Sequence, residues 1–194
     1  EGRDESATDW ESVFGLLHTI KEEIRDNFPY KVVQLDNVEA DDIIAVICKK
    51  QQKENILIIS GDKDFQQLQK KFIETEAPQE YIFEHILRGD VSDGIPNFLS
   101  PDDTFINKIK QKPILKKKLQ YWIETLMKGS DPQDFCNEYH YRNYQRNQRL
   151  IDFDYIPDDM EEDIYSTYKN TKVVSKQKIL PYLINNDLKE LIAI

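Results

Sequence analysis

The sequence predicts an α/β protein, with a parallel sheet in the first part of the chain and a mostly helical second part. One observation is the order strand, helix, strand, helix between residues 30 and 70, which is typical of a βαβ unit. Another is Asn55–Ser60, a near-continuous apolar run of the kind found in strands buried on both faces. The third is a shift to helices and turns after about Tyr81.

Each early element has its own signal. Apolar residues recurring at three- and four-residue steps predict a helix over Asp9–Asn27, which Pro29 ends. The sequence then predicts a strand over Tyr30–Leu35 and a returning helix over Glu39–Gln51. Phe65–Lys70 is predicted as the helix that follows the second strand.

The later elements are mostly helical. Apolar residues between positions 115 and 126 form one helical stripe, and Asp131-Pro132 marks a break after it. Leu150–Ile156 is predicted as a short extended piece. Pro157 is predicted to start an acidic-headed helix through Tyr168, and a last helical stretch to run from about Asp187 to the end.

Composition limits the class of protein. The chain has 194 residues, 39% of them hydrophobic and 32% charged, which is typical of a globular protein with one sizeable core. No apolar stretch could span a bilayer and no signal pattern is present, so no membrane partner is expected. The net charge of −10 argues against a generic basic nucleic-acid coat, although bound divalent cations would reverse the field near them. Two cysteines are too few for a disulfide scaffold and favour a reducing, cytoplasmic setting.

Seven acidic residues fall in three short clusters along the chain. The clusters are Glu39, Asp41 and Asp42; Asp62 and Asp64; and Asp90 and Asp93. The first opens the helix after the first predicted strand and the second directly follows the second strand. Ligands of parallel sheets lie beyond these carboxyl ends. Carboxylates that converge repel one another unless a cation neutralises them, and oxygen ligands of this kind suit Mg²⁺ or Mn²⁺.

Each cluster taken alone also has a simpler interpretation. Acids at the start of a helix favour N-terminal capping, which is the alternative for the cluster of Glu39, Asp41 and Asp42. Asp62-x-Asp64 is compatible with an Asx turn, and Asp93-Gly94 with an ordinary turn. Three acids within four positions exceed what a cap needs, so the three clusters together favour metal binding.

Four stretches carry a resemblance to a known family. They are Glu39-Ala-Asp-Asp, Ser60-Gly-Asp-Lys-Asp-Phe, Gly89-Asp-Val-Ser-Asp-Gly-Ile-Pro and Leu150-Ile-Asp-Phe-Asp-Tyr-Ile-Pro. They resemble the second half of a flap endonuclease or 5′→3′ exonuclease, and within that family its T-even phage ribonuclease H branch. The resemblance implies a PIN-like, parallel-sheet nuclease core and a Mg²⁺-dependent, structure-specific nuclease that removes RNA primers and adjacent DNA during lagging-strand synthesis.

The resemblance also implies roles for the acids. Glu39, Asp41 and Asp62 match ligands of a first metal ion; Asp64, Asp90 and Asp93 match those of a second, looser site, and Asp42 is a further candidate ligand. Two Mg²⁺ ions, replaceable by Mn²⁺, would support hydrolysis without a nucleophilic side chain. The catalytic residues it implies are Glu39, Asp41, Asp62 and Asp64. The histidines His18, His85 and His140 are scattered and are interpreted as surface or core residues.

The expected domain division lies near residue 80. Residues 1–80 are interpreted as the C-terminal part of the nuclease core, without the N-terminal strands that family members use for further ligands. Residues 81–194 are interpreted as a helical region with helix-turn-helix-type duplex binding and C-terminal helices. We therefore expect the natural protein to extend further upstream, by on the order of one hundred residues.

Two groups of basic residues are the candidate nucleic-acid contacts. The lysines are Lys108, Lys110, Lys112, Lys116, Lys117 and Lys118; the arginines, at helical spacing, are Arg142, Arg146 and Arg149. Any one of them could simply be a solvated side chain, but as groups they suit phosphate contacts that position a duplex without reading its sequence.

The expected substrates are branched or nicked DNA and RNA–DNA duplex with a 5′ end. A single-strand-binding protein and a sliding clamp are candidate protein partners, and the cytoplasm, of the host for a phage protein, is the expected location. Two other functions stay open: a related PIN-type single-strand ribonuclease, and a non-catalytic, acid-rich DNA- or clamp-binding module.

Overall fold

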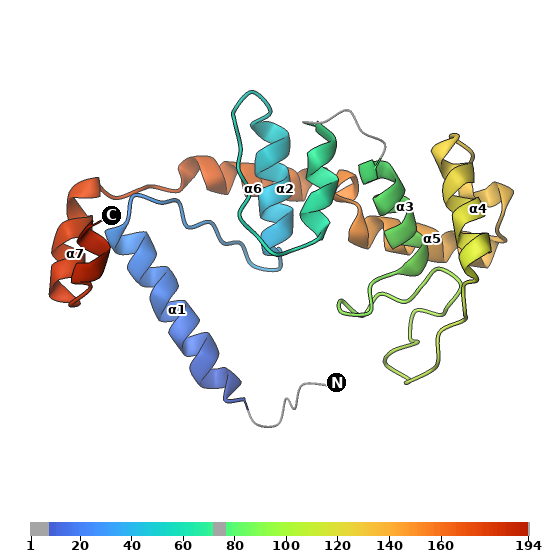
Figure 1. Ribbon diagram of the computed structural model, residues 1–194, viewed down its shortest axis with the longest axis horizontal. Coiled ribbons are helices and arrows are strands. Elements are labelled where there is room, and N and C mark those ends of the chain that lie inside the picture. Colours follow the sequence, from blue (N-terminus) through green and yellow to red (C-terminus); the bar gives the residue numbers. More distant parts are fainter. Residues whose placement is uncertain (1–7, 72–76, 194) are drawn as a thin grey trace. The chain divides into compact units, whose positions relative to one another are not determined.

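The computed structural model describes residues 8–71 and 77–193 (Figure 1). Contacts divide the chain into two compact units. One is the continuous stretch Val38–Ile164, and the other joins the chain up to Asn37 with the chain from Tyr165 onward. Each unit is described by itself.

The unit Val38–Ile164 contains all three acidic clusters and most of the helices. Its elements are α2 (Ala40–Lys50), the 3₁₀ helix η2 (Asp64–Lys71), α3 (Ala77–Arg88), α4 (Lys116–Met127), η3 (Pro132–Asp134), α5 (Glu138–Ile151), η4 (Phe153–Tyr155) and the first half of α6 (Asp158–Asn170). Within it, α3 is central, because it contacts η2, α4 and α5.

The other unit pairs the first helix with the C-terminal elements. It holds α1 (Trp10–Asn27), the rest of α6, η5 (Lys176–Lys178), α7 (Ile179–Asn185) and η6 (Lys189–Ala193). Tyr182 of α7 donates a 2.8 Å hydrogen bond to Glu23 of α1, and its ring meets that of Phe28 edge-on at 5.3 Å. None of the acidic clusters lies in this unit.

The predicted sheet is not formed within the described residues. Residues 31–35 and 55–62 lie outside helices and strands, and no strand occurs in 8–71 or 77–193. A strand needs a neighbour for its N–H and C=O groups, and the two predicted strands belong to different units. The helical part of the prediction is observed, whereas the parallel sheet stays a prediction.

The segment 55–60 nevertheless alternates as a strand would. It runs back alongside α2 (Figure 1), and Ile56 and Ile58 pack against a cluster formed by Ala45, Cys48 and Leu68. Leu57 and Ile59 point the other way and are 83% and 91% exposed. One face is therefore partly buried, where the sequence predicted two buried faces.

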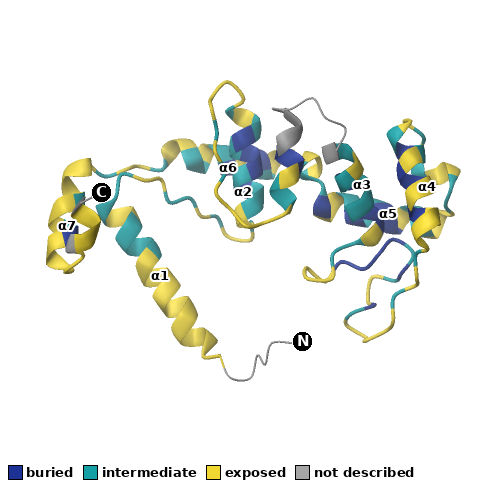
Figure 2. Ribbon diagram, in the orientation of Figure 1, coloured by how far each residue is buried: buried dark blue, intermediate teal, exposed yellow. Residues whose placement is uncertain are grey.

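The largest core joins α3, α4 and α5. Phe98 is fully buried and meets Trp122 of α4 edge-on, with ring centroids 5.0 Å apart. Ile86 and Leu87 of α3 are also fully buried in this core. Figure 2 shows buried stretches in α4 and α5. Trp122 comes from the apolar stripe that predicted α4, so the periodicity identified the buried face correctly.

Most predicted helices are confirmed within a residue or two, and one predicted extended piece is wrong. The acidic-headed helix is α6. The extended piece predicted at Leu150–Ile156 is instead the end of α5 and the turn η4, because the Asp152 carboxylate accepts from the Asp154 N–H at 3.0 Å and caps that turn. The last helical stretch, predicted from about Asp187 to the end, is observed as the 3₁₀ helix η6, and α7 was not predicted.

Candidate active site

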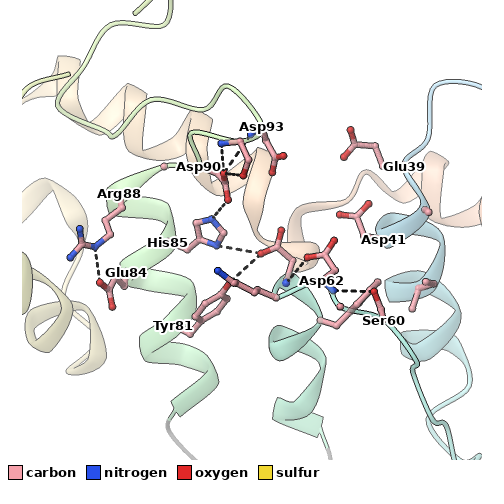
Figure 3. Close-up of a pocket in the computed structure, with 18 of the residues that line it drawn as sticks. Glu39, Asp41, Ser60, Asp62, Tyr81, Glu84, His85, Arg88, Asp90 and Asp93 are labelled. Atoms are coloured by element: carbon pink, nitrogen blue, oxygen red, sulfur yellow. Dashed lines mark hydrogen bonds and ion pairs between the residues drawn. The ribbon is translucent and has the colours of Figure 1, made fainter. Parts of the chain in front are cut away.

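Six of the seven predicted acids line one open cavity of roughly 1060 Å³ (Figure 3). They are Glu39, Asp41, Asp62, Asp64, Asp90 and Asp93. They come from the start of α2, from the turn that leads into η2 together with the first residue of η2, and from the loop after α3. Asp42, the seventh, is not among the lining residues. The fold therefore brings the three clusters to one place.

Glu39 occupies the N-cap position of α2 without capping it. Its side chain makes no cap hydrogen bond, so the capping alternative fails for this residue. The charge of Asp41 raises the pKa of Glu39, and burial, Asp42 and Asp93 add to the effect. The carboxylate thus faces like charges rather than the helix terminus.

Asp62 forms the Asx turn that its spacing allows. Its Oδ1 accepts from the Asp64 N–H at 2.9 Å, and its own N–H donates to Ser60 Oγ at 3.1 Å. These two bonds fix the turn that leads into η2. Burial raises the pKa of Asp64, an effect that the nearby His85 and a hydrogen bond from Tyr81 only partly offset.

The loop of Asp90 and Asp93 is folded around the Asp90 carboxylate. Its Oδ1 accepts from the N–H groups of Ser92 at 2.8 Å and Asp93 at 3.4 Å. Gly89 has a φ of +66°, and a Cβ there would collide with the main-chain oxygen of Ile95. Glycine is therefore required at position 89, where α3 turns into the loop.

Two further residues of α3 reach the acids and were missed from the sequence. His85 Nε2 lies 2.9 Å from Asp90 Oδ2, and Tyr81 donates to Asp64 Oδ1 at 3.1 Å (Figure 3). The interpretation of His85 as a surface or core residue is wrong, because it lines the cavity. The available signal was spacing: the two residues are four apart on the helix that ends at the Asp90 motif.

The donor set of the cavity suits a divalent cation, although its side chains are not gathered around one point. All six acids offer oxygen ligands, and burial and neighbouring carboxylates also raise the pKa of Asp93. Burial contributes most to the raised pKa of Asp93, and the charges of Asp90, Asp62 and Asp41 add a repulsion that a cation would relieve. In the described part of the chain, no three His, Cys, Asp or Glu side chains already form a group able to hold one ion.

The basic residues divide into two kinds. All six predicted lysines are exposed, and Lys118 lies over the Trp122 ring at 4.9 Å. Arg142 and Arg146 instead both bind Asp102, and Arg146 also donates to the Pro96 main-chain oxygen at 2.8 Å. These two arginines therefore bind the loop that contains Pro96 and Asp102. Arg149 remains exposed.

The helix-turn-helix-type duplex binding expected of residues 81–194 stays a prediction, and the stretch between α3 and α4 is an irregular loop. Turns and a bend occupy most of residues 98–108, irregular chain leads from there to α4, and no α-helix lies between α3 and α4. The loop is anchored by α5: the fully buried Asn143 donates to the main-chain oxygens of Phe98 at 3.1 Å and Ser100 at 3.0 Å.

Comparison with known proteins shows the family to which the chain belongs. Residues 3–87 match the family described as 5′-3′ exonuclease, N-terminal resolvase-like domain, and residues 76–194 match T4 RNase H, C terminal. The chain belongs to the 5′-3′ exonuclease family. It is 31% identical over 210 residues to the ribonuclease H of Enterobacteria phage T4, and the match covers 98% of this chain and 68% of that protein. The family resemblance predicted from the acidic motifs is confirmed.

Both matches of this nuclease-family chain include residues 76–87, a stretch that takes in most of α3. The helix that carries Tyr81 and His85 thus lies where the two regions of the family overlap. None of the helices in the described part of the chain is both long and apolar enough to cross a membrane.

Proposed function

We propose that this protein is a metal-dependent, structure-specific 5′ nuclease that removes RNA primers and adjacent DNA during lagging-strand replication. The observation that carries the proposal is the convergence of six acids from three separate segments on one cavity. A purely structural role would not require acids from three segments to share an open cavity, where they repel one another.

The proposal assigns the acids to two Mg²⁺ ions. Glu39, Asp41 and Asp62 would hold the first, and Asp64, Asp90 and Asp93 the second, with Mn²⁺ able to substitute. Asp42, which does not line the cavity, would contribute only at a distance. Two such ions supply an activated water and stabilise the leaving oxygen of the phosphodiester.

The chain's other residues would bind and orient the substrate. The exposed lysines between positions 108 and 118 offer positive charge in an acidic protein and suit contacts to phosphate. The Asx turn at Asp62 and the loop closed around Asp90 would keep the acids in place while the substrate binds. No base-reading motif is proposed, which fits recognition of structure instead of sequence.

A substrate panel tests this proposal. The full-length protein is incubated with a 5′ flap, a nicked duplex, an RNA–DNA duplex with a 5′ end and an unstructured RNA, each with Mg²⁺ or with EDTA. We expect cleavage of the first three, in Mg²⁺ only. Cleavage confined to the unstructured RNA would favour the single-strand ribonuclease, and binding without cleavage would favour the non-catalytic module.

The replication role extends the proposal to protein partners. A single-strand-binding protein and a sliding clamp are the partner classes that act at the same 5′ ends. Each partner is added to the flap assay and the cleavage rate is measured. If neither partner changes the rate, both are excluded as functional partners.

A further inference from the structure

α3 presents two side chains to the acidic cavity from one face. Tyr81 and His85 are four residues apart, so they lie one above the other on the helix, and their rings meet edge-on at 5.5 Å. The opposite side of α3 is anchored in the main core through Ile82, Ile86 and Leu87, which are at most 3% exposed. Tyr81 and His85 therefore belong to a helix whose other side is well packed.

His85 lies between two carboxylates, one at the first residue of η2 and one in the loop after α3. Its Nε2 is 2.9 Å from Asp90 Oδ2, within hydrogen-bond distance. Its Nδ1 is 3.4 Å from Asp64 Oδ1, close enough for an ion pair but without the geometry of a hydrogen bond. The His85 side chain is 13% exposed. Tyr81 donates to that same oxygen of Asp64 at 3.1 Å. Asp64 precedes α3 in the chain and Asp90 follows it, so His85 bridges the segments on either side of its own helix.

We propose that His85, assisted by Tyr81, is a positioning residue that sets the separation and orientation of Asp64 and Asp90 in the nuclease site. This inference rests on the proposed function, because positioning matters only if the two acids act together. His85 acts through the two acids. It is not assigned any contact with the substrate.

The two acids need such a link because the turns that carry them are local. The Asp90 carboxylate bonds its other oxygen to Ser92 and Asp93, and Asp64 follows directly from the Asx turn at Asp62. Neither arrangement fixes one loop relative to the other. Removing a group that hydrogen-bonds to a metal-binding side chain typically changes metal affinity by about 10–100-fold.

The test measures Mn²⁺ binding to the full-length protein by calorimetry and by electron paramagnetic resonance, without nucleic acid. We expect His85→Ala to weaken Mn²⁺ binding by about tenfold or more. His85→Gln, which retains one donor, should recover part of the loss. His18→Ala is the matched control, because His18 is exposed on α1 in the other unit. Thermal unfolding in metal-free buffer verifies that each variant is folded.

A kinetic readout separates positioning from general damage. At limiting metal, His85→Ala should lower kcat while leaving KM for a 5′-flap substrate within about twofold, because the lysines are untouched. Raising the Mn²⁺ concentration should restore much of kcat.

The possible outcomes distinguish failure of this inference from failure of the proposed function. Mn²⁺ affinity equal in wild type and folded His85→Ala overturns this inference and leaves the proposed function standing. If the wild-type protein binds no Mn²⁺, both this inference and the proposed function are wrong. If His85→Ala does not fold, the decision passes to Tyr81→Phe, which removes only the hydroxyl bonded to Asp64. A measurable loss of Mn²⁺ affinity there supports the inference, and an unchanged affinity overturns it.

Discussion

Arg146 of α5 is bound to Asp102 in the loop that follows the Asp90 motif. Its remaining donors reach the main-chain oxygen of Pro96 at 2.8 Å and the Asn147 side chain at 2.9 Å. The Arg146 side chain is 19% exposed. An arginine whose helical spacing predicted a phosphate contact is thus used to hold the loop against α5.

Arg146→Ala should therefore act on stability. Losing charge-assisted hydrogen bonds to Asp102 and Pro96 should lower the free energy of unfolding by about 1.5–3 kcal/mol. The exposed Arg149 provides the control, since Arg149→Ala should stay within about 0.5 kcal/mol. Urea denaturation measures both. Equal stabilities for the two variants would mean that the bonds to Asp102 contribute nothing.

Asn147 is a second anchor of the same loop. It is fully buried and donates to the main-chain oxygens of Ile86 at 2.8 Å and Pro96 at 3.0 Å. Asn147→Ala would remove the donor to both oxygens, and because the Pro96 oxygen keeps its bond from Arg146, the loss of the Ile86 partner should destabilise the protein by about 1–3 kcal/mol. Faster hydrogen exchange in the 89–98 loop is the accompanying sign, and unchanged exchange would argue against an anchoring role.

The lysines of α4 should contribute to duplex binding through charge alone. Replacing Lys116, Lys117 and Lys118 by alanine should weaken binding for all sequences alike. It should also flatten the slope of log K against log salt by up to about 0.9 for each phosphate that the protein no longer neutralises. Fluorescence anisotropy at several salt concentrations measures the slope. A slope identical to that of wild type would show that these lysines only solvate α4.

Glu161 should make part of the stability depend on pH. Burial by itself raises the pKa of Glu161, but hydrogen bonds from Lys49 and Lys50 outweigh that effect and leave the pKa below its usual value. A lowered pKa in the folded state means that the contribution is complete above the ordinary glutamate pKa of about 4.3 and is lost as pH falls through the folded-state value.

Glu161→Gln tests this dependence. The variant should melt below wild type at pH 7, and the difference should shrink as the pH falls below about 4.3, the ordinary glutamate pKa. Lys50 lies 2.9 Å from the carboxylate, so Lys50→Met should lower the melting temperature in the same direction. A difference between wild type and Glu161→Gln that is constant with pH would contradict the assignment.

Much of the helical fold could be predicted from the sequence because periodicity is a local property. The stripe that includes Leu119, Trp122 and Leu126 predicted α4 and its buried face, and all three side chains are buried. The acids were equally predictable as a group, since their positions at element ends imply a shared edge. The Asx turn was the alternative to metal binding for Asp62. Asp62 both forms that turn and lines the cavity, so the two interpretations do not exclude each other.

What the sequence could not provide depends on tertiary partners. Nothing local distinguishes Arg146, which binds Asp102, from Arg149, which is exposed, because the difference lies in a loop that is distant along the chain. The role of His85 was missed for the same reason, since the carboxylates that it meets come from segments on both sides of α3. The predicted sheet needs neighbouring strands, and the described residues form none.

The central claim is that the acids of this cavity carry out metal-dependent cleavage. The most direct measurement is cleavage of a 5′-flap substrate in Mg²⁺ by wild type, Asp62→Asn and Asp93→Asn, with substrate binding measured in parallel. We expect Asp62→Asn to abolish cleavage while binding is retained or tightened, because the change removes a ligand and a negative charge facing phosphate. Asp93→Asn should be milder. Cleavage by Asp62→Asn at the wild-type rate would contradict the account.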